Sequence, residues 1–202
     1  MSTTMPYQPK VDEIKALREE TSAPMMDCRR ALVDAGGDSA KAKALLLERG
    51  AAQAAKKSER VANEGTVASY VHAGGKIGVL VEVNSETDFV ARNPKFAELS
   101  RDIAMHIAAM SPQYLDRESV PAEVVERMRA EFAASVPPGK PADVAGRIVE
   151  GKLNKWFEEH CLLEQAFVKD DAMSVGDLIN ASIGTLGEKI RVRRFTKYAL
   201  GE

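Results

Sequence analysis

Candidate nucleophiles and metal ligands are few in this chain of 202 residues. There are two cysteines, Cys28 and Cys161, and three histidines, of which His160 directly precedes Cys161. Neighbours in sequence need not face each other, so a Cys–His dyad is not expected. The acidic residues are scattered without metal-ligand spacing. We therefore expect a binding protein with no catalytic residue, metal or cofactor. The enzyme alternative, with either cysteine as nucleophile, predicts that thiol alkylation destroys activity.

A different chemistry is indicated by the segment Thr87–Val90, whose sequence is Thr-Asp-Phe-Val. It follows the alternating apolar run Ile77–Val83 and precedes a helical pattern that opens at Pro94. An acidic residue and an aromatic residue therefore lie on a loop at the edge of a small sheet. The ring suits a pocket in a partner, while the carboxylate accepts backbone donors or disturbs a cation site. The alternative is that Phe89 packs onto the core of its own chain.

Composition limits the classes of protein that this chain can belong to. Its apolar content of 45% excludes a wholly disordered chain, and a net charge of -2 lacks the basic footprint of nucleic-acid binding. Residues Met1–Lys10 lack the apolar stretch of a secretory signal, and no run reaches the ~20 apolar residues of a membrane span. We expect a cytoplasmic protein without membrane contact.

Residues 1–50 are predicted to form a module of three short helices, the last ending at Gly50. Met25 and Met26 begin the second helix, and adjacent helical positions point about 100° apart, so one methionine should face outward. Cys28 is expected to be a small buried apolar side chain. Residues 51–64 then form a polar helical linker.

Residues 65–202 are predicted to form an α+β core with a small antiparallel sheet, of about three strands, covered by helices. A hairpin and the final strand supply the sheet. Helices are expected over Pro94–Met110, from Pro121 to Ser135, from Pro141 toward Trp156 and over Ser174–Ile183. The final strand, Lys189–Tyr198, has one basic face, which indicates either a phosphate contact or a charged edge strand. A ribosome- or RNA-binding module using that strand and the basic linker remains the alternative function.

The order of several motifs resembles the elongation factor Ts family along nearly the whole chain. The N-terminal signature of that family resembles Glu13–Thr21 followed by Met25–Leu32, and its second signature resembles Val83–Val90. Phe167-Val168 and Val175–Leu178 are similar to its C-terminal region. The resemblance implies a non-enzymatic exchange factor that binds elongation factor Tu, GDP-bound and nucleotide-free, and promotes GDP release so that GTP can bind. It also implies that the N-terminal module is ubiquitin-associated-like.

Site residues follow from the same resemblance, position by position. Four residues of the N-terminal module would contact the GTPase domain of elongation factor Tu, and one residue of the core would face another part of that partner. Four more would disturb its Mg²⁺ and phosphate site. The contacts to the GTPase domain are Leu17, Arg18, Met25 and Met26, and the residue of the core is His106. The residues that would disturb the Mg²⁺ and phosphate site are Thr87, Asp88, Phe89 and Val90.

This chain departs from the family pattern in two respects. Ser22 and Pro24 stand where the family commonly has glycine, so the approach of the methionines can differ. Longer members also have a duplicated core, whereas the Thr87–Val90 loop and the His106 helix directly adjoin here. A second copy would then supply the contacts of the missing half, and a homodimer is expected. No direct nucleic-acid contact is expected.

Overall fold

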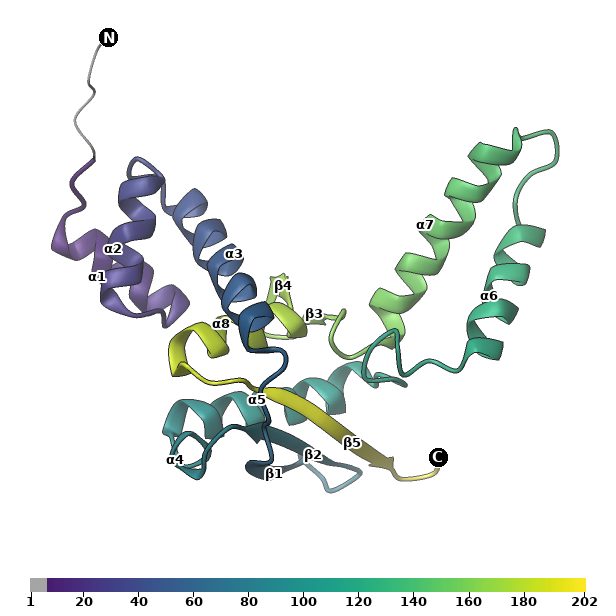
Figure 1. Ribbon diagram of the computed structural model, residues 1–202. Helices are drawn as coiled ribbons and strands as arrows, with labels where there is room; N and C mark the ends of the chain where they lie inside the picture. Colours follow the sequence, from purple (N-terminus) through teal and green to yellow (C-terminus); the bar gives the residue numbers. More distant parts are fainter. Residues whose placement is uncertain (1–6) are drawn as a thin grey trace, which may run out of the picture. The chain divides into compact units, whose positions relative to one another are not determined.

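The computed structural model describes residues 7–202 and has the predicted α+β fold (Figure 1). Residues 1–6, most of the stretch examined for a secretory signal, lie outside the described residues. The helices are α1 (Val11–Thr21), α2 (Met25–Asp34), α3 (Ser39–Lys57), α4 (Asp88–Ala91), α5 (Pro94–Met110), α6 (Ala122–Ala134), α7 (Ala142–His160) and α8 (Val175–Leu186). The strands are β1 (Glu64–Val71), β2 (Ile77–Ser85), β3 (Ala166–Phe167), β4 (Asp170–Ser174) and β5 (Arg191–Ala199).

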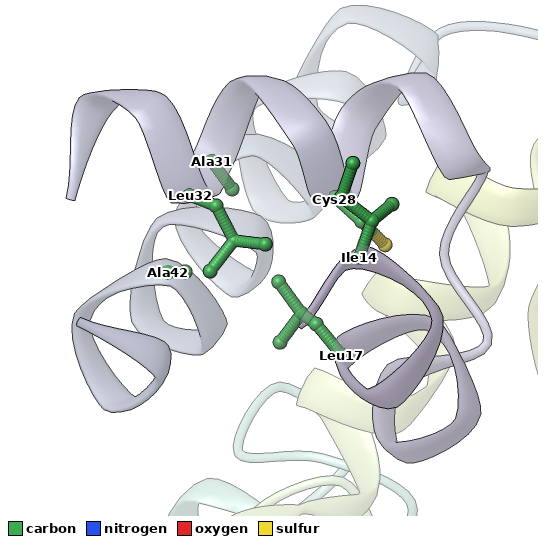
Figure 2. Packing of buried hydrophobic residues seen from close by; sticks show 6 residues of the cluster. All are labelled: Ile14, Leu17, Cys28, Ala31, Leu32 and Ala42. Carbon is green, nitrogen blue, oxygen red and sulfur yellow. The ribbon is translucent and has the colours of Figure 1, made fainter. Parts of the chain in front are cut away.

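The three N-terminal helices pack around a small apolar core (Figure 2). Asp38 caps α3, where its carboxylate accepts a hydrogen bond from the Lys41 N–H at 3.0 Å. Cys28 is fully buried in this core, as expected of a small apolar side chain. The buried members of the core are Ile14, Leu17, Cys28, Ala31, Leu32 and Ala42.

Helix α3 does not end at Gly50, as the glycine suggested, but continues to Lys57. The residues after Gly50 are mainly alanines and lysines, which favour a helix. The backbone of α8 explains the glycine itself: a Cβ at position 50 would lie 3.0 Å from the Asn180 carbonyl oxygen. Gly50 thus permits a close helix approach and does not end the helix.

The sheet has three antiparallel strands in the order β1-β2-β5, so the final strand is an edge strand, one of the two alternatives considered for it. The hairpin of β1 and β2 is confirmed. Gly65 has a φ of +140°, and a Cβ there would lie 2.1 Å from the Val83 carbonyl oxygen on the neighbouring strand. Only glycine fits this position.

The two helices predicted here are present as α6 and α7, and they form a helical hairpin whose connection contains Pro137-Pro138-Gly139 (Figure 1). Helix α7 runs to His160, one turn beyond the predicted end at Trp156. Leu153 and Phe157 on α7 are buried against Val120 and Cys161, with partly buried side chains of α6 around them. A short hairpin of β3 and β4 was not predicted, because its strands are too brief to show a two-residue period.

The chain divides into two compact units, and each unit consists of three segments of the sequence. Helix α3 continues into the predicted boundary region as far as Lys57, and strand β1 begins at Glu64, the last residue of that region. Independent folding of residues 1–50 and 65–202 therefore stays a prediction. The first unit runs to Ala68 and includes Glu82–Ser100 and Asp177–Arg193; the second comprises Ser69–Val81, Arg101–Gly176 and Arg194–Glu202.

Candidate partner-binding site

The Thr-Asp-Phe-Val segment is a single helical turn, α4, rather than the open loop that the sequence suggested. Thr87 is its N-cap, and the Thr87 hydroxyl oxygen accepts a hydrogen bond from the Val90 N–H at 3.4 Å. Val90 points inward and is 4% exposed, whereas Phe89 is 80% exposed. Local packing of Phe89 onto its own core, the alternative for this residue, is not observed.

Asp88 is also exposed, and its carboxylate pairs with Arg92 one turn later at 2.9 Å. Both side chains are more than half exposed, and an ion pair of this kind contributes little to stability. The carboxylate can therefore be released to another donor or cation at small cost. Asp88 and Phe89 together present a negative charge and an apolar ring from one turn of helix.

The turn is held by acidic side chains that the sequence analysis did not select. Glu188 accepts two hydrogen bonds from Thr87, one from its N–H at 3.0 Å and one from its hydroxyl at 2.7 Å. Glu86, the residue before Thr87, accepts a hydrogen bond from the N–H of Lys189, the residue after Glu188, at 2.6 Å. It also accepts a longer hydrogen bond from Arg60 at 3.3 Å. These donors lower the pKa of Glu86, the Lys189 N–H most and the Arg60 guanidinium next.

The predicted contact residues of the N-terminal helices differ in exposure. Arg18 is exposed, and both methionines are at the surface, Met25 at 41% and Met26 at 56%, where one of the two was expected to face outward. Leu17 is different: it is 1% exposed and packs in the three-helix core (Figure 2). Its predicted direct contact with a partner is inconsistent with this conformation, because its side chain lies between the three helices.

The turn between α1 and α2 is linked to elements beside α4. Ser22 adopts a left-handed conformation with a φ of 55° and ends α1. Its carbonyl oxygen accepts a hydrogen bond from Lys95 Nζ at 3.2 Å, at the start of α5, and lies 3.5 Å from the Thr185 hydroxyl oxygen, near the end of α8. The methionine-bearing helix and the Phe89 turn thus belong to one compact unit.

His106, expected to face the partner, is fully buried on α5. Its Nδ1 accepts the Val168 N–H at 3.2 Å, so its Nε2–H donates to Gln165 Oε1 at 2.9 Å. Gln165 in turn donates to the Glu159 carbonyl at 2.8 Å. Burial lowers the pKa of His106, although the Gln165 hydrogen bond partly opposes this. A direct partner contact by this ring is inconsistent with the structure, because both ring nitrogens and the ring itself are occupied within the chain.

The cysteines have no catalytic environment among residues 7–202. Both are fully buried. Burial raises the pKa of the Cys28 thiol and raises that of Cys161 to about 11. The His160 ring stacks on Trp156 with centroids 4.5 Å apart, and its Nδ1–H donates to the Trp156 carbonyl at 2.8 Å. The same described residues contain no group of His, Cys, Asp and Glu side chains that could hold a metal ion.

Several basic side chains of the RNA-binding alternative are already engaged within the chain. Arg60 pairs with Glu86, and Arg193 of β5 pairs with Glu82 at 2.9 Å. Lys189 Nζ donates to the Ser58 carbonyl and to the Arg60 carbonyl, the latter at 2.8 Å. These contacts reduce the charge available to phosphates. No helix within residues 7–202 has the length and apolar character needed to cross a membrane.

Comparison with known proteins places the chain among translation elongation factors. Residues 44–202 match the family described as Elongation factor TS. The chain is 53% identical over 191 residues to Elongation factor Ts of Koribacter versatilis, which covers 94% of this chain and 87% of that protein. It is 55% identical over 190 residues to Elongation factor Ts of Syntrophomonas wolfei (94% and 89%) and 52% identical over 191 residues to that of Geobacter metallireducens (94% and 88%).

The chain therefore belongs to the elongation factor Ts family, whose members are guanine nucleotide exchange factors of protein biosynthesis.

Proposed function

We propose that the chain binds GDP-bound elongation factor Tu and promotes GDP release by disturbing the Mg²⁺ and phosphate site of that GTPase. GTP then binds to the vacated site. The observation that carries the proposal is Phe89, an aromatic ring that is 80% exposed on a turn held by hydrogen bonds. An exposed ring on a fixed turn is suited to insertion into a partner, because little order has to be gained when it binds.

Phe89 and Asp88 act differently in this mechanism. Burying a phenylalanine side chain contributes about 1.5–3 kcal/mol, which stabilises a partner conformation with a pocket for the ring. The Asp88 carboxylate competes for the backbone donors and the cation that hold the phosphates of GDP. By linkage, whatever stabilises the nucleotide-free complex weakens GDP binding by the same factor. The chain acts by binding alone and uses no cofactor of its own.

The N-terminal helices supply further affinity. Met25 and Met26 are flexible apolar side chains at the surface, and Arg18 adds a charged contact one helix away. Thr87 and Val90 support the turn, Thr87 as its cap and Val90 as its buried anchor. Leu17 contributes through the packing of the three N-terminal helices and His106 through its support of the β3–β4 hairpin, not through contact with elongation factor Tu.

Release of labelled GDP from elongation factor Tu tests the proposal. Phe89→Ala is expected to slow exchange at least about tenfold, since a loss of about 1.4 kcal/mol corresponds to a factor of ten. Leu200→Ala is the matched control, because Leu200 is also 80% exposed but lies at the C-terminal end of the chain. Wild-type exchange by Phe89→Ala, with the control also unchanged, would refute the inserted ring.

We also propose that the chain works as a homodimer. Strands β1 and β5 are the edges of the three-stranded sheet, and Val67 and Val71 on β1 are 63% and 67% exposed. Edge strands with apolar side chains are commonly covered, and two-fold pairing is the commonest arrangement. Light scattering at micromolar concentration should give a mass near twice the 22.0 kDa of the chain. A monomer with full exchange activity would contradict this proposal.

A further inference from the structure

We infer that Glu188 is a positioning residue for nucleotide exchange: its carboxylate fixes the Thr87 turn so that Phe89 is presented before a partner binds. The inference rests on the proposed function, since it concerns how the inserted ring is held. Glu188 and Thr87 are 101 residues apart in sequence but lie in the same compact unit.

The two hydrogen bonds from Thr87 to Glu188 require a carboxylate. Thr87 offers two donors, its N–H at 3.0 Å and its hydroxyl at 2.7 Å, and each reaches a different oxygen of Glu188. An ionised carboxylate accepts at both oxygens, whereas an amide of the same size accepts at one and donates at the other. Glu188 therefore matches both donors of Thr87 at once.

These bonds also set the direction of the helix cap. A hydroxyl has one hydrogen to donate, and Thr87 gives it to Glu188. Its lone pairs then remain for the Val90 N–H, which donates to the same oxygen at 3.4 Å. The Ser85 hydroxyl donates to the Thr87 carbonyl at 2.9 Å and secures the other side of the residue. Glu188 thus orients the group that begins α4.

The segment that carries Glu188 is itself anchored. Gly187 ends α8 with a φ of +79°, which turns the chain directly into Glu188. The next residue, Lys189, donates its N–H to Glu86 at 2.6 Å, so the pairs 86–87 and 188–189 exchange hydrogen bonds in both directions. The Lys189 ammonium also donates to the Arg60 carbonyl just beyond α3. The carboxylate is therefore held to the turn from a supported position.

A turn of four residues cannot hold its own shape in water, because helix nucleation is unfavourable at that length. Without an external clamp, binding would have to order the turn. The entropy cost of fixing several backbone residues is of the same order as the gain from burying one ring. The hydrogen bonds between Thr87 and Glu188, here called the clamp, order the turn when the chain folds. The free energy gained by burying Phe89 can then stabilise the altered conformation of the partner.

A double-mutant cycle with Glu188 and Phe89 tests the inference. Glu188→Ala is expected to slow GDP release from elongation factor Tu by on the order of tenfold, as misplacement of a contact group commonly does. In the Phe89→Ala background the same change should have no further effect, because the clamp acts only through the ring. Glu188→Gln should fall between, since its amide keeps one of the two acceptor oxygens.

A readout without the partner separates positioning from general destabilisation. Amide hydrogen exchange at Thr87 and Val90 should accelerate in Glu188→Ala, while amides in the core of α5 remain protected. Glu150→Ala is the matched control, because it also removes a glutamate carboxylate that is engaged within the chain, in this case by Arg129 on the neighbouring helix. That control should leave both the exchange rate and the protection of the turn unchanged.

Each outcome bears on one of the two proposals. Wild-type GDP release by Glu188→Ala, with Phe89→Ala impaired, would overturn the positioning role and leave the proposed function standing. An equal loss in both backgrounds would also overturn it, because Glu188 would then act on the whole fold. Wild-type GDP release by Phe89→Ala would refute the proposed function, and with it the role of Glu188 in exchange. If Glu188→Ala does not fold, Glu188→Gln gives the same test at smaller amplitude.

Discussion

The Phe89 turn and His106 were both expected to contact the partner, yet the Phe89 side chain is exposed and the His106 side chain is buried. Around α4, hydrogen bonds hold the backbone and the cap residue, and the Phe89 ring is left 80% exposed. At His106, the hydrogen bonds go to the side chain itself, which is fully buried. A residue whose backbone is held and whose side chain is free is suited to contact a partner. A residue whose side chain is fully engaged supports its neighbours.

The support that His106 gives is to the β3–β4 turn. Val168, bound to His106 Nδ1, lies between Phe167, which packs 6.0 Å from the imidazole, and Lys169. Lys169 pairs with Asp102 at 2.6 Å, one helical turn before His106. Two adjacent turns of α5 thus hold this hairpin. A loss of activity on changing His106 would then report a displaced hairpin rather than a lost partner contact.

The largest expected effect is on stability, from His106→Ala. The change leaves Gln165 Oε1 and the Val168 N–H without their partner and opens a cavity, at a combined cost of roughly 3 kcal/mol or more. Phe89→Ala should change the free energy of unfolding by less than about 0.5 kcal/mol, as exposed positions commonly do. Urea denaturation of both variants measures the contrast. Equal stabilities would remove the distinction between the two sites.

The same contrast should recur within the N-terminal helices. Leu17→Ala is expected to destabilise the three-helix core by about 2–4 kcal/mol, because the side chain is 1% exposed. Met26→Ala should leave that core intact and weaken binding of elongation factor Tu by about 1 kcal/mol, the transfer energy of a partly buried side chain. Circular dichroism measures the first change and calorimetry the second. Unchanged affinity of Met26→Ala would remove this methionine from the contact surface.

Much of the fold was predictable because its signals are local. Helix α5 has the predicted bounds, Pro94–Met110, since a proline begins it and its apolar period is regular. The clamp was not predictable, because Thr87 and Glu188 are joined only by the fold. The helix end expected at Gly50 was wrong because that glycine is explained by the backbone of α8, which is distant in sequence. Leu17 was assigned to a partner contact although the packing of three helices buries it. Motifs selected the candidate site residues but did not tell exposed residues from buried ones.

A smaller effect is expected on the pH dependence of the free energy of unfolding. It should depend on the buried His106 and not on the exposed His72. Burial lowers the pKa of His106 below its ordinary 6.5, so the unfolded chain takes up a proton more readily than the folded one. The stabilising contribution is complete above about pH 6.5 and is lost as the pH falls from there through the folded-state pKa, at up to about 1.4 kcal/mol per unit. Denaturation at pH 7.5 and 5.5 should show a slope that His106→Gln flattens. His72→Gln, which removes an exposed ring, is the control and should retain the slope.

The smallest effect is expected for chemical labelling of the thiols. Cys161, like His106, is a buried side chain. With a pKa of about 11, the fraction of thiolate at pH 8 is about one in a thousand, and the sulfur is fully buried. Burial also raises the pKa of Cys28. Iodoacetamide at pH 8 should therefore leave GDP exchange unchanged and add no mass to the native protein, while denatured protein takes up label at both cysteines. Rapid native labelling with loss of exchange would favour a reactive thiol and would show that burial in the folded chain does not protect these residues.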